Sequence, residues 1–256
     1  GVPLAAKAFS MGVRIEHLQA DIDQAQYGQF AGNPYLPPAD YRLSCHFPEG
    51  DSAYTFCMCP GGYVVAAASE TGGVVTNGMS EFRRDAVNAN AALLVTLEPA
   101  SFPVPGPLGG MYWQRQIEQR AFAAGGGDYR APAQLVGDFL AGQPSIGAGR
   151  VRPSYRPGVT WCDLHQVLPE EITTTLAKAL PALGRKLAGF DMPEAVLTAP
   201  ETRSSSPVRI LRDDTLQSTC RGLYPCGEGA GYAGGIISAA VDGMRCAEAL
   251  IANLEP

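Results

Sequence analysis

A glycine-rich segment near the end of the sequence is the place where residue types and spacing most clearly suggest chemistry. It covers residues 223–238 and holds Gly229-x-Gly231-x-x-Gly234 between a short strand-like run and an apolar helical stretch. Glycines lack a Cβ atom, so backbone N–H groups in such a turn can approach a ligand closely, and the following helix adds the positive end of its dipole. Glu228 can accept hydrogen bonds from ligand hydroxyls. These features suit a sugar-phosphate or ribityl chain, or the electron-rich edge of a flavin ring.

The position of this segment argues against an ordinary dinucleotide-binding unit. In such a unit the glycine turn leads into a helix, a second strand and an acidic residue roughly 20 residues further on that holds the ribose. Only the helix fits before Pro256, so we expect the turn to serve another role. The alternative is that the glycines merely let a helix pack closely on a strand, with Gly235 and Gly243 at helix contacts.

Residues 201–207 (Glu-Thr-Arg-Ser-Ser-Ser-Pro) form a second candidate site. Arg203 offers a fixed fork of donors and Ser206 a hydroxyl, which could bind an anionic substrate or the flavin. The alternative is a turn with a surface arginine. This turn leads into a predicted strand at 208–211, which we expect to pair with a strand at 223–226.

The cysteines suggest less. Cys57 and Cys59 lie two apart on a predicted strand and should face the same side. Their C-x-C spacing is not the C-x-x-C or C-x4-C of flavin disulfide reductases, so we expect small buried residues there. No Cys or His pair has the spacing of a structural zinc site, and we predict no metal site. The candidate zinc ligands would be Cys45, His46, Cys162 and His165, whose spacing matches no such site.

Histidine chemistry is not indicated either. None of His17, His46 and His165 lies in a motif with a carboxylate partner, and no Ser-His-Asp arrangement is evident, so we expect satisfied or exposed side chains. The polar residues 83–85, beside Asn88 and Asn90, are typical of a helix start, with the lining of a substrate cleft as the alternative.

The surrounding pattern predicts the elements that must position these residues. Alternation and β-rich runs predict strands at 12–17, 41–47, 53–58, 63–68, 92–97 and 195–198, of which 41–68 should form an antiparallel meander. Helical spacing predicts a helix from Trp113 that closes at Gly125, a second from Pro169 that Pro181 interrupts, and a last one after Gly235. In the last helix, the inward-facing residues should be Ile237, Val241, Met244 and Ile251. Residues 141–158 should form a long loop.

Composition narrows the class of protein. The 256 residues are 46% apolar, enough for a core, and the formal charge of -6 includes no basic run, which argues against a nucleic-acid surface. No run approaches the roughly 18 apolar residues of a membrane span, and no signal peptide is evident. The seven cysteines fit no disulfide framework, so we expect reduced thiols and a cytoplasmic protein. Because the sequence opens on Gly1, we expect a piece of a longer chain.

Motifs along nearly the whole chain resemble bacterial FAD-dependent dehydrogenase-like proteins, also called NAD(FAD)-utilising dehydrogenases. The closing segment 223–243 carries the resemblance most clearly. The other matching motifs, in chain order, are Gly12–His17, Phe56–Gly62, Val75–Ser80, Asn88–Val95, Tyr129–Phe139, Pro153–Gly158 and Glu201–Ile210.

The resemblance implies an α+β fold: a β-rich cap or substrate domain with packed helices at 1–194, and a segment at 195–256 whose strand-turn-helix completes a Rossmann-like FAD domain. It also implies that the N-terminal half with the dinucleotide fingerprint is missing here, since residues 1–200 contain no G-x-G-x-x-G. The backbone or side chains expected to lie by the flavin are those of Gly227, Glu228, Gly229, Gly231, Gly234, Gly235 and Ile236. N–H groups of Gly234, Gly235 and Ile236 would meet the pyrimidine edge and stabilise the anionic reduced ring.

The function that follows is that of a fragment of a flavin-dependent oxidoreductase, with hydride transfer through flavin N5 on a small-molecule substrate and NADH or NADPH as possible donor. The catalytic acid or base cannot be named from the residues. The alternative is a binding or scaffold protein that keeps the flavin fold without turnover. Alone, this chain should not hold FAD tightly, because the half that binds the ADP part is absent.

Overall fold

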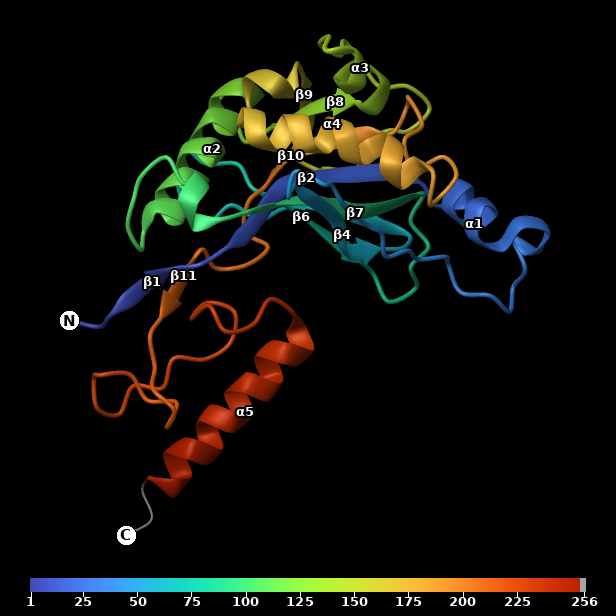
Figure 1. Cartoon of the computed structure of the whole chain (residues 1–256). Coiled ribbons are helices and arrows are strands. Elements are labelled where there is room, and N and C mark those ends of the chain that lie inside the picture. The colour runs from blue at the N-terminus through green and yellow to red at the C-terminus, as the bar shows by residue number, and fades with distance from the viewer. Residues whose placement is uncertain (254–256) are drawn as a thin grey trace. The chain divides into compact units, whose positions relative to one another are not determined.

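The computed structural model describes residues 1–253. Its strands are β1 (Leu4–Ala6), β2 (Phe9–Leu18), β3 (Ser44–His46), β4 (Ser52–Cys59), β5 (Gly62–Ala66), β6 (Thr76–Ser80), β7 (Asn88–Leu97), β8 (Ala131–Leu135), β9 (Val159–Trp161), β10 (Val196–Glu201) and β11 (Val208–Ile210). Its helices are α1 (Gln19–Tyr27), α2 (Gly109–Gly125), α3 (Val136–Ala141), α4 (Glu170–Gly184) and α5 (Ile236–Ala252). Short 3-10 turns cover Gly28–Phe30, Pro99–Ser101 and Leu164–Gln166 (Figure 1).

The chain divides into two compact units. The sheet unit comprises Met11–Thr96 and Gln116–Thr202. The glycine-turn unit comprises Gly1–Ser10, Leu97–Arg115 and the chain from Arg203 onward. The expected division into a cap domain at 1–194 and a flavin-domain segment at 195–256 stays a prediction about the longer protein.

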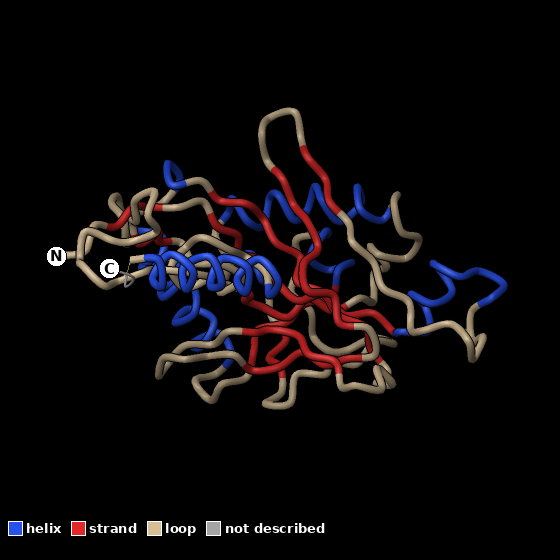
Figure 2. Tube along the Cα trace, turned by 90° about the horizontal axis from the view of Figure 1, so that it is seen from below, coloured by secondary structure: helices blue, strands red, loops and turns tan. Residues whose placement is uncertain are grey.

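A mixed sheet of seven strands organises the sheet unit, with the order β3-β4-β7-β2-β10-β8-β9. The β8–β9 pair is parallel, whereas β10 is antiparallel to both β2 and β8. Figure 2, with strands in red, shows strand segments that run side by side. The fold is therefore mixed α and β, as the sequence predicts, and the structure adds that most of its strands form one large mixed sheet.

The central strand β2 is buried on both faces. Met11, Val13 and Ile15 are fully buried, and so are the alternating Arg14 and Glu16. The period-two pattern correctly predicts a strand, but its polar side faces a covered interior and not solvent. The reason is coverage of the polar side by β6 and by residues 152–154, which supply hydrogen-bond partners to these charged side chains.

The predicted helices are present, with one correction. The helix closed by Gly125 corresponds to α2, and the helix that begins after Pro169 corresponds to α4. Helix α4 continues through Pro181 to Gly184, so the expected interruption is wrong. Its buried stripe of Ile172, Leu176, Leu180 and Leu183 faces the core, and this packing offsets the hydrogen bond that proline removes.

Strand partners differ from the predicted ones at two places. The run at 63–68 forms β5, which pairs with β6 and not with β4, so the meander is limited to the antiparallel β3–β4 pair. Strand β11 pairs with β1, and residues 223–226 form no strand, so the expected pairing of 208–211 with 223–226 is wrong. Strand β11 pairs with a strand about 200 residues away, and β5 pairs with β6 across the irregular residues 67–75, and local sequence patterns encode neither pairing.

Two further expectations are settled by the backbone. Residues 142–158 contain no helix or strand, in agreement with the predicted long loop. Residues 83–85 form a turn and not a helix start, and Asn88 and Asn90 belong to β7. Among residues 1–253, no helix is both long and apolar enough to span a bilayer.

Candidate functional site

The glycine turn, defined here as Gly227–Gly235, connects a loop to the N-terminus of α5. Gly227 and Gly231 adopt φ values of +71° and +86°, which favour glycine. A Cβ atom on Gly231 would lie 2.4 Å from the carbonyl oxygen of Val208, so this glycine serves close packing against β11. Gly231 is therefore needed for close packing of the turn on β11, and a contact of its backbone with a cofactor stays a prediction.

Three other glycines of the turn, at positions 229, 234 and 235, are not required for packing. A Cβ atom on Gly229 or on Gly234 would meet no atom within 4 Å, and one on Gly235 would meet only the Ser238 hydroxyl at 3.6 Å. None of these three has a positive φ. Open space therefore lies beside the backbone at these three positions. Neither the packing of the described residues nor the backbone conformation requires glycine there.

Helix α5 begins directly at this open space. Its N-cap is Gly235, whose N–H donates to the Ser238 hydroxyl over 3.2 Å, and that hydroxyl donates back to the Gly235 carbonyl over 2.9 Å. The N–H groups of the first turn have no acceptor within the helix, and the dipole of a 17-residue helix places partial positive charge there. Ile236 is 86% exposed, which leaves its backbone accessible.

The apolar residues of α5 are exposed, contrary to the prediction that they face inward. Ile237 is 76% exposed and Met244 65%, and Val241 and Ile251 are exposed as well. The buried side of the helix carries Asp242 and Cys246 instead. Helical periodicity identifies the apolar stripe correctly, but it does not tell whether this chain itself covers the stripe.

The glycine turn is held on α5 by an ion pair that sequence reasoning missed. Arg212 donates to both oxygens of Asp242 over 2.6 and 3.0 Å and to the Pro225 carbonyl over 2.8 Å. The same carboxylate accepts the N–H of Gly227 over 2.9 Å. The hydrogen bonds from Arg212 lower the pKa of Asp242. Asp242 stands in the motif 238–243, but Arg212 lies 30 residues away, and no local pattern joins the two.

The guanidinium of Arg212 is also packed on an aromatic ring. It lies 3.6 Å from the ring centroid of Tyr232, whose hydroxyl donates to the Ile210 carbonyl over 2.9 Å. Arginine stacked on an aromatic ring and paired with a carboxylate is held in one orientation. The turn is therefore positioned from two sides, by Asp242 of α5 and by Tyr232 within the turn.

Glu228 is exposed on the turn and lies near Lys7. Its negative charge raises the pKa of Lys7. Burial, helped by the positive charge of Arg209, has the larger and opposite effect, so the pKa of Lys7 is lowered overall. The Lys7 ammonium donates to the carbonyls of Ala8 and Ser206. Because the Glu228 side chain is exposed, its carboxylate is accessible to a ligand hydroxyl.

The second predicted site, at Arg203 and Ser206, lies in the same unit. Arg203 is half-buried. The Ser206 hydroxyl donates to the Val208 carbonyl over 2.8 Å and accepts the Val208 N–H over 3.2 Å, which starts β11. The structure therefore gives Ser206 a local structural role, and a role of either residue in substrate binding stays a prediction.

The sheet unit contains a buried charged network that no sequence prediction named. Arg14 is fully buried and forms a two-pronged ion pair with Glu201. Its other donors bind the Cys57 carbonyl at 2.9 Å, the Asn90 oxygen at 3.1 Å and the Asn77 oxygen at 3.0 Å. Burial raises the pKa of Glu201, and the charge of Arg14 opposes this shift.

Both Cys57 and Glu201 stand at irregularities of their strands. The pairing of β4 with β7 shifts between Phe56 and Cys59, and that of β10 with β2 shifts between Thr198 and Glu201. Such bulges re-aim backbone and side chains. Cys57 has φ of +43° and is exposed, and Cys59 is only partly buried, so the expectation of two buried cysteines on one strand face is wrong.

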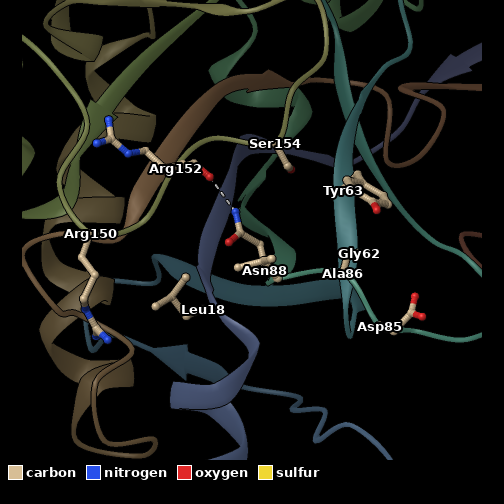
Figure 3. Close-up of a pocket in the computed structure, with 10 residues that line it drawn as sticks. Leu18, Gly62, Tyr63, Asp85, Ala86, Asn88, Arg150, Arg152 and Ser154 are labelled. Carbon is tan, nitrogen blue, oxygen red and sulfur yellow. Dashed lines mark hydrogen bonds between the residues drawn. The ribbon is translucent and has the colours of Figure 1, made fainter.

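The sheet unit also contains a cavity of about 440 Å³. Asn88 and Ser154 line it, and behind them the Glu16 carboxylate accepts hydrogen bonds from the Asn88 amide at 2.9 Å and the Ser154 hydroxyl at 2.5 Å. Burial raises the pKa of Glu16. In Figure 3 the Asn88 amide also reaches the Arg152 carbonyl, and Asp85 lies at the opposite side from Arg150. The cleft alternative for Asp85 and Asn88 thus has a structural basis.

The histidines differ in part from the prediction. His17 is fully buried and bonded through Nε2 to the Phe190 carbonyl. His165, expected to lack a carboxylate partner, bonds through Nδ1 to Asp163 over 2.8 Å. His46 is exposed. Among residues 1–253, no group of three or more His, Cys, Asp or Glu side chains is arranged to hold a metal ion.

The chain combines a unit built on a large mixed sheet with a second unit that ends in a glycine turn and a helix. Residues 8–204 match the family described as FAD-dependent protein, C-terminal domain-like. The chain belongs to this family. An uncharacterized protein of Clostridium beijerinckii (strain ATCC 51743 / NCIMB 8052) is 49% identical over 257 residues, which cover 99% of this chain and 48% of the relative. The chain therefore spans about half the length of that relative.

The glycine turn offers groups that could contact a ligand with hydroxyl, carbonyl or phosphate oxygens. The family match ends before the turn, but the similarity to the Clostridium protein extends over nearly the whole chain. The open space at Gly229 and Gly234 would admit a ligand where a Cβ atom would intrude, and the first turn of α5 supplies N–H donors for carbonyl and phosphate oxygens. Glu228 adds an acceptor for hydroxyls.

Proposed function

We propose that this chain is the C-terminal part of an FAD-dependent oxidoreductase and that its glycine turn closes the flavin site. The observation that carries the proposal is the open space at Gly229 and Gly234 beside the N-terminus of α5, in a chain of an FAD-dependent family. Packing requires a glycine at Gly231 but not at these two positions, so a ligand is the simplest reason for the missing side chains.

Five residues of the turn and the first residue of α5 have distinct parts in this proposal. Gly227, fixed by Asp242, and Gly229 bring the backbone close to the ribityl chain, whose hydroxyls meet Glu228. The N–H groups of Gly234 and Ile236 would meet the pyrimidine edge of the ring, and that of Gly235, which donates to the Ser238 hydroxyl in this structure, would join them by exchanging this acceptor for the ring. Because these donors are preorganised at a helix N-terminus, they favour negative charge at that edge.

The chemistry that FAD supplies when bound is hydride transfer through N5 of its ring. The chain's own contribution is to bind and orient, and to hold positive dipole ends where negative charge develops. Arg203 is the residue of this unit that we assign to an anionic substrate, because a guanidinium binds carboxylates in two-pronged fashion. NADH or NADPH is the proposed electron donor.

A second half of the protein completes the fold in this proposal. The exposed apolar side chains of α5, which include Ile237 and Met244, form a stripe along one side of the helix and are not single, scattered surface residues. Such a stripe suits burial against another domain. The Clostridium relative is about twice as long as the chain. The missing half would carry the dinucleotide-binding βαβ unit, and α5 would complete a Rossmann-like domain with it.

The visible spectrum of the full-length protein tests the proposal. Purified full-length protein should show a flavin spectrum with one FAD per chain, and NADH or NADPH should bleach it under anaerobic conditions. The chain of 256 residues alone should bind added FAD at least about a hundredfold more weakly, since it lacks the proposed ADP-binding half.

Other spectra decide against parts of the proposal. A colourless full-length protein that does not bind added FAD would contradict a flavin site altogether. A yellow protein that neither nicotinamide cofactor nor dithionite bleaches would favour a scaffold that keeps the flavin fold without turnover. Stoichiometric flavin on the isolated chain would show that no second half is needed.

A further inference from the structure

Two cysteines of the glycine-turn unit lie next to each other although 20 residues separate them in the sequence. Cys226 directly precedes the glycine turn, and Cys246 lies in the middle of α5. Both are free thiols. Their spacing matches no redox or metal motif, so only the folded structure brings them together.

The contacts on both sides of Cys226 fix it against α5. Its neighbour Pro225 accepts hydrogen bonds from Arg212 at 2.8 Å and from the Cys246 thiol at 3.9 Å. Its other neighbour, Gly227, donates to Asp242, which lies one helical turn before Cys246. The Cys226 thiol is close enough to Cys246 to add to the rise of its pKa that burial causes.

The two thiols differ in exposure and in their charged surroundings. Cys226 is exposed to solvent, whereas only 4% of the surface of Cys246 is exposed. The Cys246 sulfur accepts a hydrogen bond from Arg212 over 3.2 Å. Burial raises the pKa of Cys246, and Arg212 opposes the shift while Asp242 adds to it. Cys226 is therefore the accessible nucleophile, and Cys246 is the protected partner beside a cation that can stabilise its thiolate.

We propose that Cys226 and Cys246 are a redox-active pair that forms a reversible disulfide between the glycine turn and α5. A small disulfide is the oxidant. The Cys226 thiolate attacks one of its sulfur atoms and releases one thiolate, which leaves a mixed disulfide on Cys226. Cys246 then loses its proton and attacks the Cys226 sulfur, which expels the second thiolate. Two protein thiols become one disulfide, and the small disulfide becomes two thiols.

The disulfide would change the glycine turn itself. In the reduced protein, hydrogen bonds to Asp242 and Arg212 hold the turn on α5. A covalent bond at Cys226 adds a link that cannot open locally, so the turn becomes more rigid on oxidation. This inference does not depend on a bound flavin, because it concerns only residues of this chain.

Peptide mapping after oxidation tests the pair directly. The chain is incubated with glutathione disulfide, quenched with acid, alkylated and digested with trypsin without reduction. Trypsin cuts after Arg221 and Arg245, so Cys226 and Cys246 fall in the separate peptides 222–245 and 246–256, and Cys220 in 213–221. The expected product is peptide 222–245 linked to 246–256, and dithiothreitol should reverse it.

Three variants separate the roles of the thiols. Cys246→Ser should retain glutathione on Cys226, because no second thiol expels it. Cys226→Ser should leave Cys246 unmodified, because that thiol is buried. Cys220→Ser, which removes a nearby exposed thiol, should form the linked peptide like the wild type. In the wild type, amide exchange within 223–235 should slow at least about tenfold on oxidation.

The opposite results would overturn the inference. Wild type that accumulates glutathione on Cys226 as Cys246→Ser does would show that Cys246 does not act as partner. A linked peptide that forms only after addition of urea, or that joins Cys220 instead, would show that the folded chain does not pair these thiols. A linked peptide with unchanged amide exchange would remove the effect on the turn.

Discussion

Arg212 and Asp242 form a two-pronged ion pair, with nitrogen–oxygen distances of 2.6 and 3.0 Å, that ties the glycine turn to α5. The carboxylate also accepts the Gly227 N–H, and the guanidinium also donates to Pro225. This ion pair therefore supplies hydrogen-bond partners to Pro225 and Gly227 at the start of the turn and joins them to the side of α5 that carries Asp242. Such preorganised support is what a cofactor-binding turn requires.

Asp242→Asn should loosen the turn. The asparagine amide keeps one oxygen but loses the negative charge that strengthens the hydrogen bonds of Asp242. The free energy that holds the turn on α5 should therefore fall by about 1–3 kcal/mol. The exchange rate of the Gly227 amide should then rise about tenfold or more, as measured by NMR. Asp214→Asn, at an exposed position of the same unit, is the control and should leave that rate unchanged.

Arg14→Lys should destabilise the sheet unit strongly. Lysine cannot reproduce the two-pronged contact with Glu201 together with the three other hydrogen bonds, so a buried charge is left poorly paired. Loss of such a contact should lower the free energy of urea unfolding by about 3 kcal/mol or more.

The matched control for Arg14 is Arg150→Lys. Arg150 pairs with Asp21 over 2.5 Å, but its side chain is 50% exposed, so its replacement should change stability by less than about 1 kcal/mol. Equal effects of the two substitutions would argue against a buried network at Arg14.

His17 should make stability depend on pH. Burial lowers its pKa from 6.5 to about 4, so between these values the unfolded chain binds a proton that the folded chain does not. The free energy of unfolding should therefore fall as pH is lowered through 6.5, by about 2 kcal/mol between pH 7 and pH 5 from this group.

Urea unfolding of His17→Gln at both pH values isolates this effect. The variant should lose about 2 kcal/mol less than the wild type over that interval, whereas His46→Gln, at an exposed position, should follow the wild type. A His17→Gln variant with an unchanged pH slope would contradict a neutral buried His17.

Gly231→Ala and Gly229→Ala should differ in stability. At Gly231 a methyl group would lie 2.4 Å from the Val208 oxygen in a left-handed conformation, so we expect a loss of more than about 1 kcal/mol in urea unfolding. At Gly229 the space is open and the loss should stay below about 0.5 kcal/mol. Equal losses would mean that the whole turn serves packing.

Local patterns predicted the elements well and their partners poorly. The helices at Gly109–Gly125 and Glu170–Gly184 follow from apolar spacing and from glycine and proline at their ends. Alternation placed the strand through Arg14, but it could not show that the polar face is covered, because coverage comes from β6 and residues 152–154. The pairing of β11 with β1 likewise joins residues about 200 positions apart.

For the candidate site, the sequence identified the glycines but not their support. The glycine spacing is local, and so is the start of α5. The contacts of Asp242 with Arg212 and of Cys246 with Cys226 depend on how the loop before the turn folds back on the helix, which no periodicity encodes. The prediction that Ile237 and Met244 face inward is wrong because none of the described residues covers this side of α5.

The affinity of the full-length protein for FAD, measured by reconstitution of the flavin-free form, tests the central claim most directly when Gly234→Ala is compared with Gly243→Ala. Both positions have room for a methyl group in this chain, but only Gly234 lies at the proposed flavin edge. We expect Gly234→Ala to weaken FAD binding at least about tenfold and Gly243→Ala to leave it within about twofold. Equal affinities of both variants and the wild type would contradict a flavin site at the glycine turn.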